Sequence, residues 1–585
     1  MSAVVLPQAP ASGPPGSPSA SQKRAQQPLL VEAWSLAALA DRLPLKVPVD
    51  PALPPSPKLS YRSAYRPPDP AALPQPADWA TLSDFELALA LVDFSPLERL
   101  LASMYRPSAK GQVPFHPVSL FLCVCLRREL GLGWRALARL LAGPHGAAWR
   151  AHFGFEAGRT PSASGLRYFF GAVGPEVFDQ LCPRLVALLR EQGLFPERST
   201  FPGDPPERGI TVSQDGMLHP ARARPSCQLA TDACYQPSSE PSPSAPAERP
   251  LEGPLPLLRA AEPGRRPCRA REHGLEGCAC DGADCQRQCR RASRLDPQAR
   301  FIHYAGHNRP SAQPTPGAAA GRGRGGPGRR ANKGTDVFGY RSMAERALDD
   351  RYAVAWTLRS RLYPANTDER TIFVERLQAL RATFPDLTIG EWLDDAGVGF
   401  SDCLAAIWQL GALRMVDLRA DKTDADPEIC LRRGYDARGR PLCPHGYALR
   451  ANGYDSERRR AKYVCAQACG REPPPAGGPL QPVADCPYLD PDRPAGFVVN
   501  VGRTLPDGSL RLAREVPYGS PAWQARYGRR NLSESRNGQL EGLGLKRMPS
   551  YGLTRNQKEV QIADFVLNLR TLGRLVRQAT QQALS

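Results

Sequence analysis

Long apolar runs are missing from this sequence, and their absence limits where the protein can act. No stretch approaches the roughly 20 apolar residues that a membrane-spanning helix needs. The N-terminus, MSAVVLPQAPASGPPGSPSASQKR, lacks a basic segment followed by a long apolar one, so it does not resemble a secretory signal. We therefore expect an intracellular protein with no membrane partner. In that setting the 16 cysteines are expected to be thiols or metal ligands rather than disulfides.

The composition favours a large chain with much irregular structure and a polyanionic partner. The 585 residues are enough for several domains. A hydrophobic fraction of 42% suffices for a core, whereas 62 Pro and 51 Gly indicate many loops. The net charge of +18 favours nucleic acid as a partner, and a merely solvated basic surface explains it equally well.

Helical periodicity is clearest in residues 117–192, where apolar positions recur at helical spacing between Gly and Pro residues. Within this block, Ser162 or Ser164 is placed to cap a short helix that carries Arg167. Two short helices joined by a tight turn suit helix-turn-helix DNA binding. An ordinary all-α bundle is the commoner explanation of the same pattern.

The residues that follow have an α/β order. A buried strand is predicted over 209–217, ending at Asp215, and a later helix is predicted to begin near Thr367 or Asp368. The whole order is strand, strand, strand, helix, strand, helix, strand, which predicts a mixed sheet. The runs that carry it after the first strand are DVFGYRSMAERA, RYAVAWTLRS, ANTDERTIFVERLQALRATF, TIGEWLD, SDCLAAIWQLG and ALRMVDLR.

Three carboxylates lie in contexts that suit phosphodiester chemistry. Asp215 and Asp395 end apolar runs, and Glu534 lies in the basic, helix-compatible stretch YGRRNLSESRNGQLE. Two strand ends and one helix face can converge, and three converging carboxylates can hold two divalent metal ions. Hard oxygen ligands suit Mg²⁺. Asp394 competes with Asp395 for the second position.

These motifs, in this order, resemble the ribonuclease-H-like DDE transposases of bacterial insertion sequences. The late stretch matches the family signature Y-x2-R-x3-E at Tyr527, Arg530 and Glu534. Two departures stand out: Val398 replaces a tyrosine, and Glu541 replaces a lysine, for which Lys546 is the nearest substitute. The other matching segments are TPSASGLRYFF, VSQDGMLH, FGYRSMAE, YPANTDER and LDDAGVGFSD.

The resemblance implies an α/β protein with a ribonuclease-H-like mixed sheet and two Cys-containing insertions, preceded by an all-α N-terminal DNA-binding domain. Asp215, Asp395 and Glu534 would hold Mg²⁺ or Mn²⁺, cleave DNA at transposon ends and transfer the strand to target DNA. The implied partners are double-stranded DNA, as terminal inverted repeats and target, and a second copy in a homodimer; the implied location is the bacterial cytoplasm, at the nucleoid. The DNA-binding residues would be Arg167, Tyr527, Arg529, Arg530 and Lys546.

Two other functions fit the same residues. One is a catalytically inactive or domesticated DNA-binding protein, and the other is a metal-dependent nuclease without strand transfer.

Cysteines concentrate in two segments that interrupt the α/β order. The second segment predicts a structural zinc site, with His445 as an alternative ligand. The predicted zinc ligands are Cys443, Cys465, Cys469 and Cys486. For the first segment two interpretations are open, a metal site or free thiols. Its cysteines are Cys268, Cys278, Cys280, Cys285 and Cys289. Core positions are predicted for Cys123, Cys125, Cys182 and Cys403.

These observations divide the chain into six parts. They are a disordered tail (1–28), a linker with short helices (29–110), a helical DNA-binding domain (111–200), the first part of the catalytic domain (205–419, with an insertion at 220–335), a Cys-containing insertion (420–520) and the catalytic and C-terminal helices (521–585).

Overall fold

The computed structural model describes the helical block, the central sheet and the C-terminal helices, together with parts of both insertions. In full, it describes residues 42–49, 53, 60–69, 71, 73, 76–102, 105, 113–223, 226–227, 233–234, 266–267, 291–293, 295–304, 335–417, 440–455, 460–466, 486, 488, 496–501, 515–516 and 521–584. The predicted tail at 1–28, the Cys268–Cys289 cluster and Cys469 lie outside these residues. Within these ranges, no helix combines the length and apolar character needed to cross a lipid bilayer.

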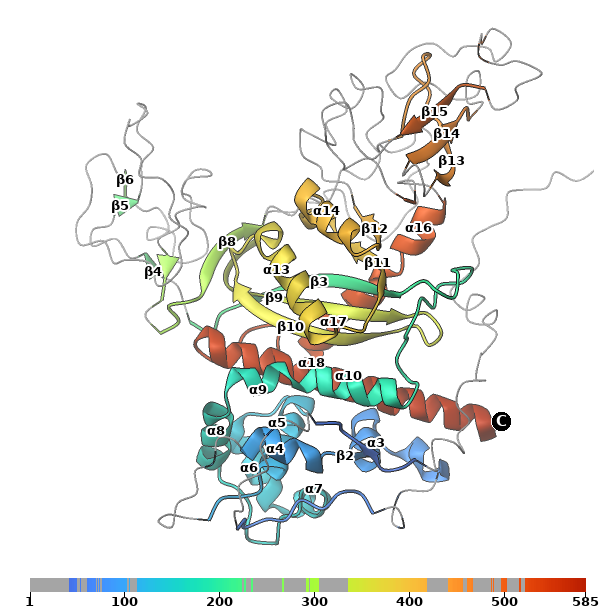
Figure 1. The fold of residues 1–585 in the computed structure, drawn as a ribbon. Coiled ribbons are helices and arrows are strands. Elements are labelled where there is room, and N and C mark those ends of the chain that lie inside the picture. The colour runs from blue at the N-terminus through green and yellow to red at the C-terminus, as the bar shows by residue number, and fades with distance from the viewer. Residues whose placement is uncertain are drawn as a thin grey trace, which may run out of the picture.

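A mixed sheet of six strands forms the centre of the molecule (Figure 1). Its order is β10-β9-β3-β11-β12, and β8 also pairs with β9. The pairs among β8, β9, β10 and β3 are antiparallel, whereas β11 is parallel to both β3 and β12. The predicted α/β class with a mixed sheet is therefore confirmed. The strands are β3 (Ile210–Pro220), β8 (Arg300–Tyr304), β9 (Thr335–Asp349), β10 (Val354–Pro364), β11 (Ile389–Asp394) and β12 (Leu413–Val416).

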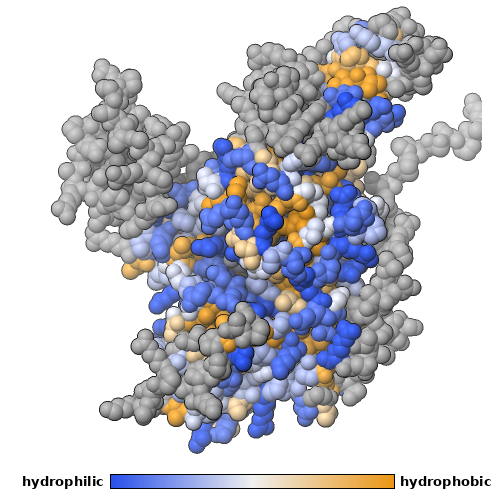
Figure 2. All heavy atoms as spheres, in the orientation of Figure 1, coloured by the Kyte–Doolittle hydropathy of each residue, from blue (hydrophilic) through white to orange (hydrophobic). Residues whose placement is uncertain are grey.

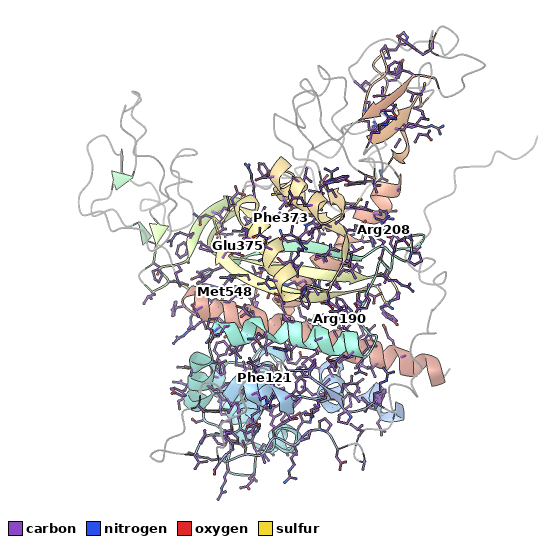
Figure 3. The ribbon with its side chains drawn as sticks, in the orientation of Figure 1. Phe121, Arg190, Arg208, Phe373, Glu375 and Met548 are labelled. Carbon is purple, nitrogen blue, oxygen red and sulfur yellow. The ribbon has the colours of Figure 1, made fainter. Side chains whose placement is uncertain are left out.

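Two helices follow the strands as predicted, α13 (Glu369–Thr383) and α14 (Ser401–Gln409). Asp368 is the N-cap of α13, and its side chain accepts a hydrogen bond from the Arg370 amide at 3.0 Å. Phe373 of α13 packs edge-on against Trp392 of β11, with ring centroids 5.4 Å apart. Glu375 of the same helix is exposed (Figure 3), so α13 turns one apolar face to the sheet.

The late helix is predicted as one element but is two, α16 (Pro521–Tyr527) and α17 (Arg530–Gly542). Trp523 and Tyr527 stack with ring centroids 4.3 Å apart and pack in a cluster with Leu393 of β11. Gly528 and Arg529 form a turn between the two helices. Tyr527 therefore lies on a different helix from Arg530 and Glu534.

The N-terminal helices pack on the other side of α18 (Leu553–Leu584), which lies between them and the sheet (Figure 1). The side chain of Phe121, labelled in Figure 3, is fully buried, and its ring centroid lies 5.5 Å from that of Phe565 of α18. Ser162 caps α8 by accepting from the Gly165 amide at 3.1 Å, which confirms one of the two predicted caps. The four predicted core cysteines are buried. These helices are α3 (Asp84–Leu91), α5 (Pro117–Glu129), α6 (Trp134–Ala142), α7 (Ala147–Phe153), α8 (Ala163–Ala172), α9 (Pro175–Asp179) and α10 (Leu181–Glu191).

The described parts of the two insertions contain short strands. β8 lies in the segment predicted to lack regular structure, and it forms because the first residues of β9 offer it an edge. The second insertion contributes a separate three-stranded antiparallel sheet of β13 (Arg450–Asp455), β14 (Arg460–Val464) and β15 (Val498–Val501).

Candidate active site

Asp215 lies in the middle of β3, on the surface covered by α17. The strand was predicted to end at Asp215, but it continues because β9 pairs with it as far as Pro220. Asp215 is 5% exposed. Its carboxylate oxygens accept hydrogen bonds from Arg530 Nη2 at 3.2 Å and from Asn537 Nδ2 at 2.8 Å.

The end of β11 offers two adjacent aspartates, and strand geometry separates them. Leu393 pairs in parallel register with Ser213, and successive side chains of a strand point to opposite faces. Asp395 therefore continues the face of Leu393, which is the face covered by α16 and α17. Asp394 continues the face of Trp392, whose indole Nε1 donates to it at 3.2 Å. The side chain of Asp395 is 46% exposed, whereas Asp394 is buried, so the geometry favours Asp395 for the site.

Arg530, at the start of α17, brings the three predicted acids together. Its guanidinium forms ion pairs with Asp215 at 3.2 Å, with Asp395 at 3.7 Å and with Glu534 one turn along the helix. Burial acts to lower the pKa of Arg530, but the negative charge around it holds that pKa above its usual value. Two strands and one helix thus present their carboxylates to a single cationic group.

A fourth carboxylate, Glu369, lies beside these acids and was missed from the sequence. It forms an ion pair with Arg341 of β9. A Cβ atom added to Gly397 would lie 2.8 Å from both Glu369 Oε2 and Asp395 Oδ1, so these oxygens are at most twice that distance apart. A Cβ added to Gly216 would lie 3.5 Å from Glu369 Oε1. The two glycines leave the space in which the carboxylates approach one another.

The sequence offered two signals for Glu369, its position in the first turn of a predicted helix and its place in the family-matching segment YPANTDER. Asn537 had a signal too, because it lies three residues after Glu534 and shares its helix face.

The clustered negative charge perturbs the titration of these groups. Burial raises the pKa of Asp215, although the Arg530 and Arg536 charges oppose this. Burial and the neighbouring Asp395 charge raise the pKa of Glu369 to about 7. Burial also holds the pKa of Asp394 well above its usual value. The four carboxylates of the site outnumber the two guanidinium groups paired with them, those of Arg341 and Arg530.

Arg529 was predicted to bind DNA, but the structure gives it internal partners. Its guanidinium is buried and forms ion pairs with Asp350 at 2.8 Å and with Glu391. It also lies 4.4 Å from the centre of the Phe201 ring. Contact with DNA would break these ion pairs in a buried setting, so we no longer place Arg529 at the DNA surface.

The other late-helix predictions have different surroundings. The side chain of Lys546 is 78% exposed and pairs with Glu541 at 3.4 Å, so the glutamate that replaces the family lysine contacts its nearest substitute. Burial raises the pKa of Tyr527, and the charge of Asp417 adds to this effect. Tyr527 is therefore a protonated hydroxyl close to the acids, although it reaches them from α16.

A basic cavity of about 520 Å³ lies between the N-terminal helices and the segment after α17. Arg167, Arg222 and Arg555 line it and are exposed, and the rings of Trp134 and Tyr551 also line it. Two further arginines in its wall, Arg127 and Arg128, share one carboxylate, the buried Glu559, so the three groups together keep one positive charge. From Glu534 to Leu543, which also lines the cavity, α17 rises about 14 Å. The cavity and the acids thus lie at two ends of one helix.

Three of the four predicted zinc ligands, Cys443, Cys465 and Cys486, line a second and very small cavity beside the β13–β15 sheet, together with His445. In the part of the chain that the structure describes, no three His, Cys, Asp or Glu side chains already have the close arrangement of metal ligands, here or around Asp215.

Comparison with known proteins identifies no relative: no protein-family model, no curated protein and no solved structure matches this chain.

Proposed function

We propose that this protein cleaves DNA at the ends of a transposable element and joins those ends to target DNA. The observation that carries the proposal is the convergence of Asp215, Asp395 and Glu534 on one guanidinium group. The strand order, with three antiparallel strands followed by two parallel ones, supports a ribonuclease-H-like fold. The motif order supports the DDE transposase family in particular.

The donor set at this site fits a hard divalent cation. All four acidic side chains offer carboxylate oxygens, which are the ligands that Mg²⁺ and Mn²⁺ prefer. The excess negative charge favours a cation, and the Arg530 guanidinium already supplies one at the point where the acids meet. When bound, Mg²⁺ would polarise the scissile phosphate and activate a water or a 3′-hydroxyl for in-line attack.

The chain's own residues have separate tasks in this proposal. Arg530 leaves the carboxylates and pairs with a phosphate of the DNA, for which its planar, bidentate group is suited. Asn537 keeps Asp215 oriented through its 2.8 Å hydrogen bond. Asp395 is held by the Gly397 amide, which donates to it at 2.6 Å. These bonds position the oxygens before any substrate binds, which lowers the cost of forming the site.

The basic cavity supplies the path of the DNA strand. Exposed arginines suit phosphates, and the Trp134 and Tyr551 rings suit contact with an unpaired base or a sugar. Because α17 leads from the acids to this cavity, a strand cut at Asp215 would extend toward Arg167 and Arg222.

The test uses DNA that carries the inverted repeats flanking the gene, incubated with purified protein and Mg²⁺. We expect cut ends and joined products, and we expect Asp215→Asn and Glu534→Gln to abolish both while DNA binding persists. Glu375→Gln, an exposed acid on α13, is the matched control and should behave as the wild type. Cutting without joining would instead identify a nuclease, binding without cutting a DNA-binding protein, and cleavage retained by Asp215→Asn would remove that residue from the site.

A further inference from the structure

The three described cysteines of the second insertion meet at one end of the β13–β15 sheet. Val464, the last residue of β14, pairs with both Arg450 and Val498, the first residues of β13 and β15. Cys465 follows Val464 directly, so it lies at the end where β13 and β15 begin. Cys443 and Cys486 precede those two strands, and all three cysteines line one cavity of about 10 Å³.

A tight turn brings His445 to the same cavity. The Gly446 amide donates to the Cys443 carbonyl, and the Cys443 amide donates to the Tyr447 carbonyl, both at 2.8 Å. Gly446 has a φ of +79°, which other residues rarely adopt, so this glycine allows the turn. His445 Nε2 is buried and, among the residues that the structure describes, has no hydrogen-bond partner. A buried nitrogen is unfavourable without a partner, so a ligand at this position would stabilise the turn.

The small sheet has too little apolar content to hold itself together. Among the described residues, its core cluster has three buried members, Leu449, Ala461 and Tyr463, with Tyr447 and Val464 buried beside them. Tyr488 and Val498 beside it are 40% and 38% exposed, and Figure 2 shows apolar surface over this sheet. Isolated small sheets need another source of stability, and a structural metal ion is a common one.

We propose that Cys443, His445, Cys465 and Cys486 bind one structural Zn²⁺ ion. Three thiolates and one imidazole form a closed tetrahedral set, with Zn–S distances of about 2.3 Å and a Zn–N distance of about 2.0–2.1 Å. All four side chains line one small cavity, which is where the ion would bind. The thiols release their protons to solvent when the ion binds. The metal–ligand bonds then stabilise the sheet in place of a larger hydrophobic core. In this proposal His445 Nε2 is the fourth ligand.

The experiment measures zinc in the purified full-length protein by elemental analysis, and then Co²⁺ spectra after metal exchange. We expect about one zinc per chain and the intense visible bands of tetrahedral, thiolate-bound cobalt. Cys443→Ser and His445→Ala should lose most of the metal. His445→Cys should keep it and add thiolate character to the cobalt spectrum, which separates loss of a ligand from loss of folding.

Two controls make the result specific. His145→Ala changes the exposed histidine of Pro144-His145-Gly146, the same tripeptide as Pro444-His445-Gly446, and should retain full zinc. Cys469→Ser should also retain it. A wild-type protein without zinc would overturn the proposal, as would a His445→Ala variant that keeps its zinc. Asp215→Asn should leave the zinc content unchanged, so this site is tested apart from the acidic one.

Discussion

Arg530 is the residue on which the acidic site depends, because it holds three carboxylates that would otherwise repel one another. Its ion pairs with Asp215 and Glu534 keep the site assembled without a metal ion. The same contacts must be given up when a divalent cation is bound. The affinity for a divalent cation therefore depends on the balance of charge at the site. Glu369 adds a carboxylate to this balance, and Arg341 forms an ion pair with it.

Replacing Glu369 tests whether this fourth acid belongs to the metal site. Glu369→Gln should weaken Mn²⁺ binding by about tenfold or more, because one carboxylate beside Asp395 loses its charge; a factor of ten corresponds to about 1.4 kcal/mol. Titration calorimetry with Mn²⁺ measures this directly. Glu375→Gln on the same helix should bind as the wild type does. Equal Mn²⁺ affinity in the Glu369 variant would assign Glu369 to the Arg341 ion pair alone.

At the scale of elements, α17 connects two environments through its opposite faces. Arg530, Glu534 and Asn537 face the carboxylates of the sheet. Arg536 points away from them to Asp564 of α18, with hydrogen bonds of 2.6 and 2.8 Å. Both members of this pair are fully buried. The pair fixes the rotation of α17, and hence the direction in which Arg530 and Glu534 point.

Breaking the Arg536–Asp564 pair should therefore cost much stability. Arg536→Met leaves Asp564 buried without a counterion and should lower the free energy of unfolding by about 3–5 kcal/mol. Urea denaturation measures the change. The double variant with Asp564→Leu should recover most of the loss, whereas Lys546→Ala, which breaks an exposed pair, should cost at most about 1 kcal/mol. A stable single variant would show that the packing of α17 fixes its rotation.

At the scale of the whole molecule, one hydrophobic core joins the N-terminal helices to the sheet through α18. Leu120 and Phe121 of α5 and Phe565 of α18 belong to the same cluster as Trp392 of the sheet. The basic cavity and the acidic site are therefore joined by one continuous hydrophobic core. A DNA strand would contact the basic cavity and the acidic site at the same time. Its affinity would therefore depend on several protein charges.

The salt dependence of DNA binding should report these charges. The wild type should bind an end-containing duplex with an affinity that falls steeply as salt rises. Replacing Arg167, Arg222 and Arg555 with alanine should reduce the slope of log affinity against log salt by about 2 to 3, since each phosphate contact contributes about 0.9. Fluorescence anisotropy across a salt series gives the slope. Arg381→Ala, an exposed arginine of α13, should leave it unchanged; an unchanged slope in the triple variant would exclude the cavity from the DNA path.

The sequence by itself determined the local features of this protein. Apolar runs placed the strand that carries Asp215 and the strand that ends beside Asp395, and a capping signal placed the helix that begins beside Asp368. These are short-range effects, so a linear pattern contains them. The family motifs indicated which of the acidic residues to assign to the candidate metal site.

Only the tertiary structure decided how these parts meet. It placed Glu369 beside Asp395 and buried Arg529 against Glu391, and in both cases the partner is remote in the chain. It also continued β3 past Asp215, because β9 supplies the hydrogen bonds there. Hydrogen-bond partners, burial and charge neighbours belong to the packed molecule, and no local pattern records them.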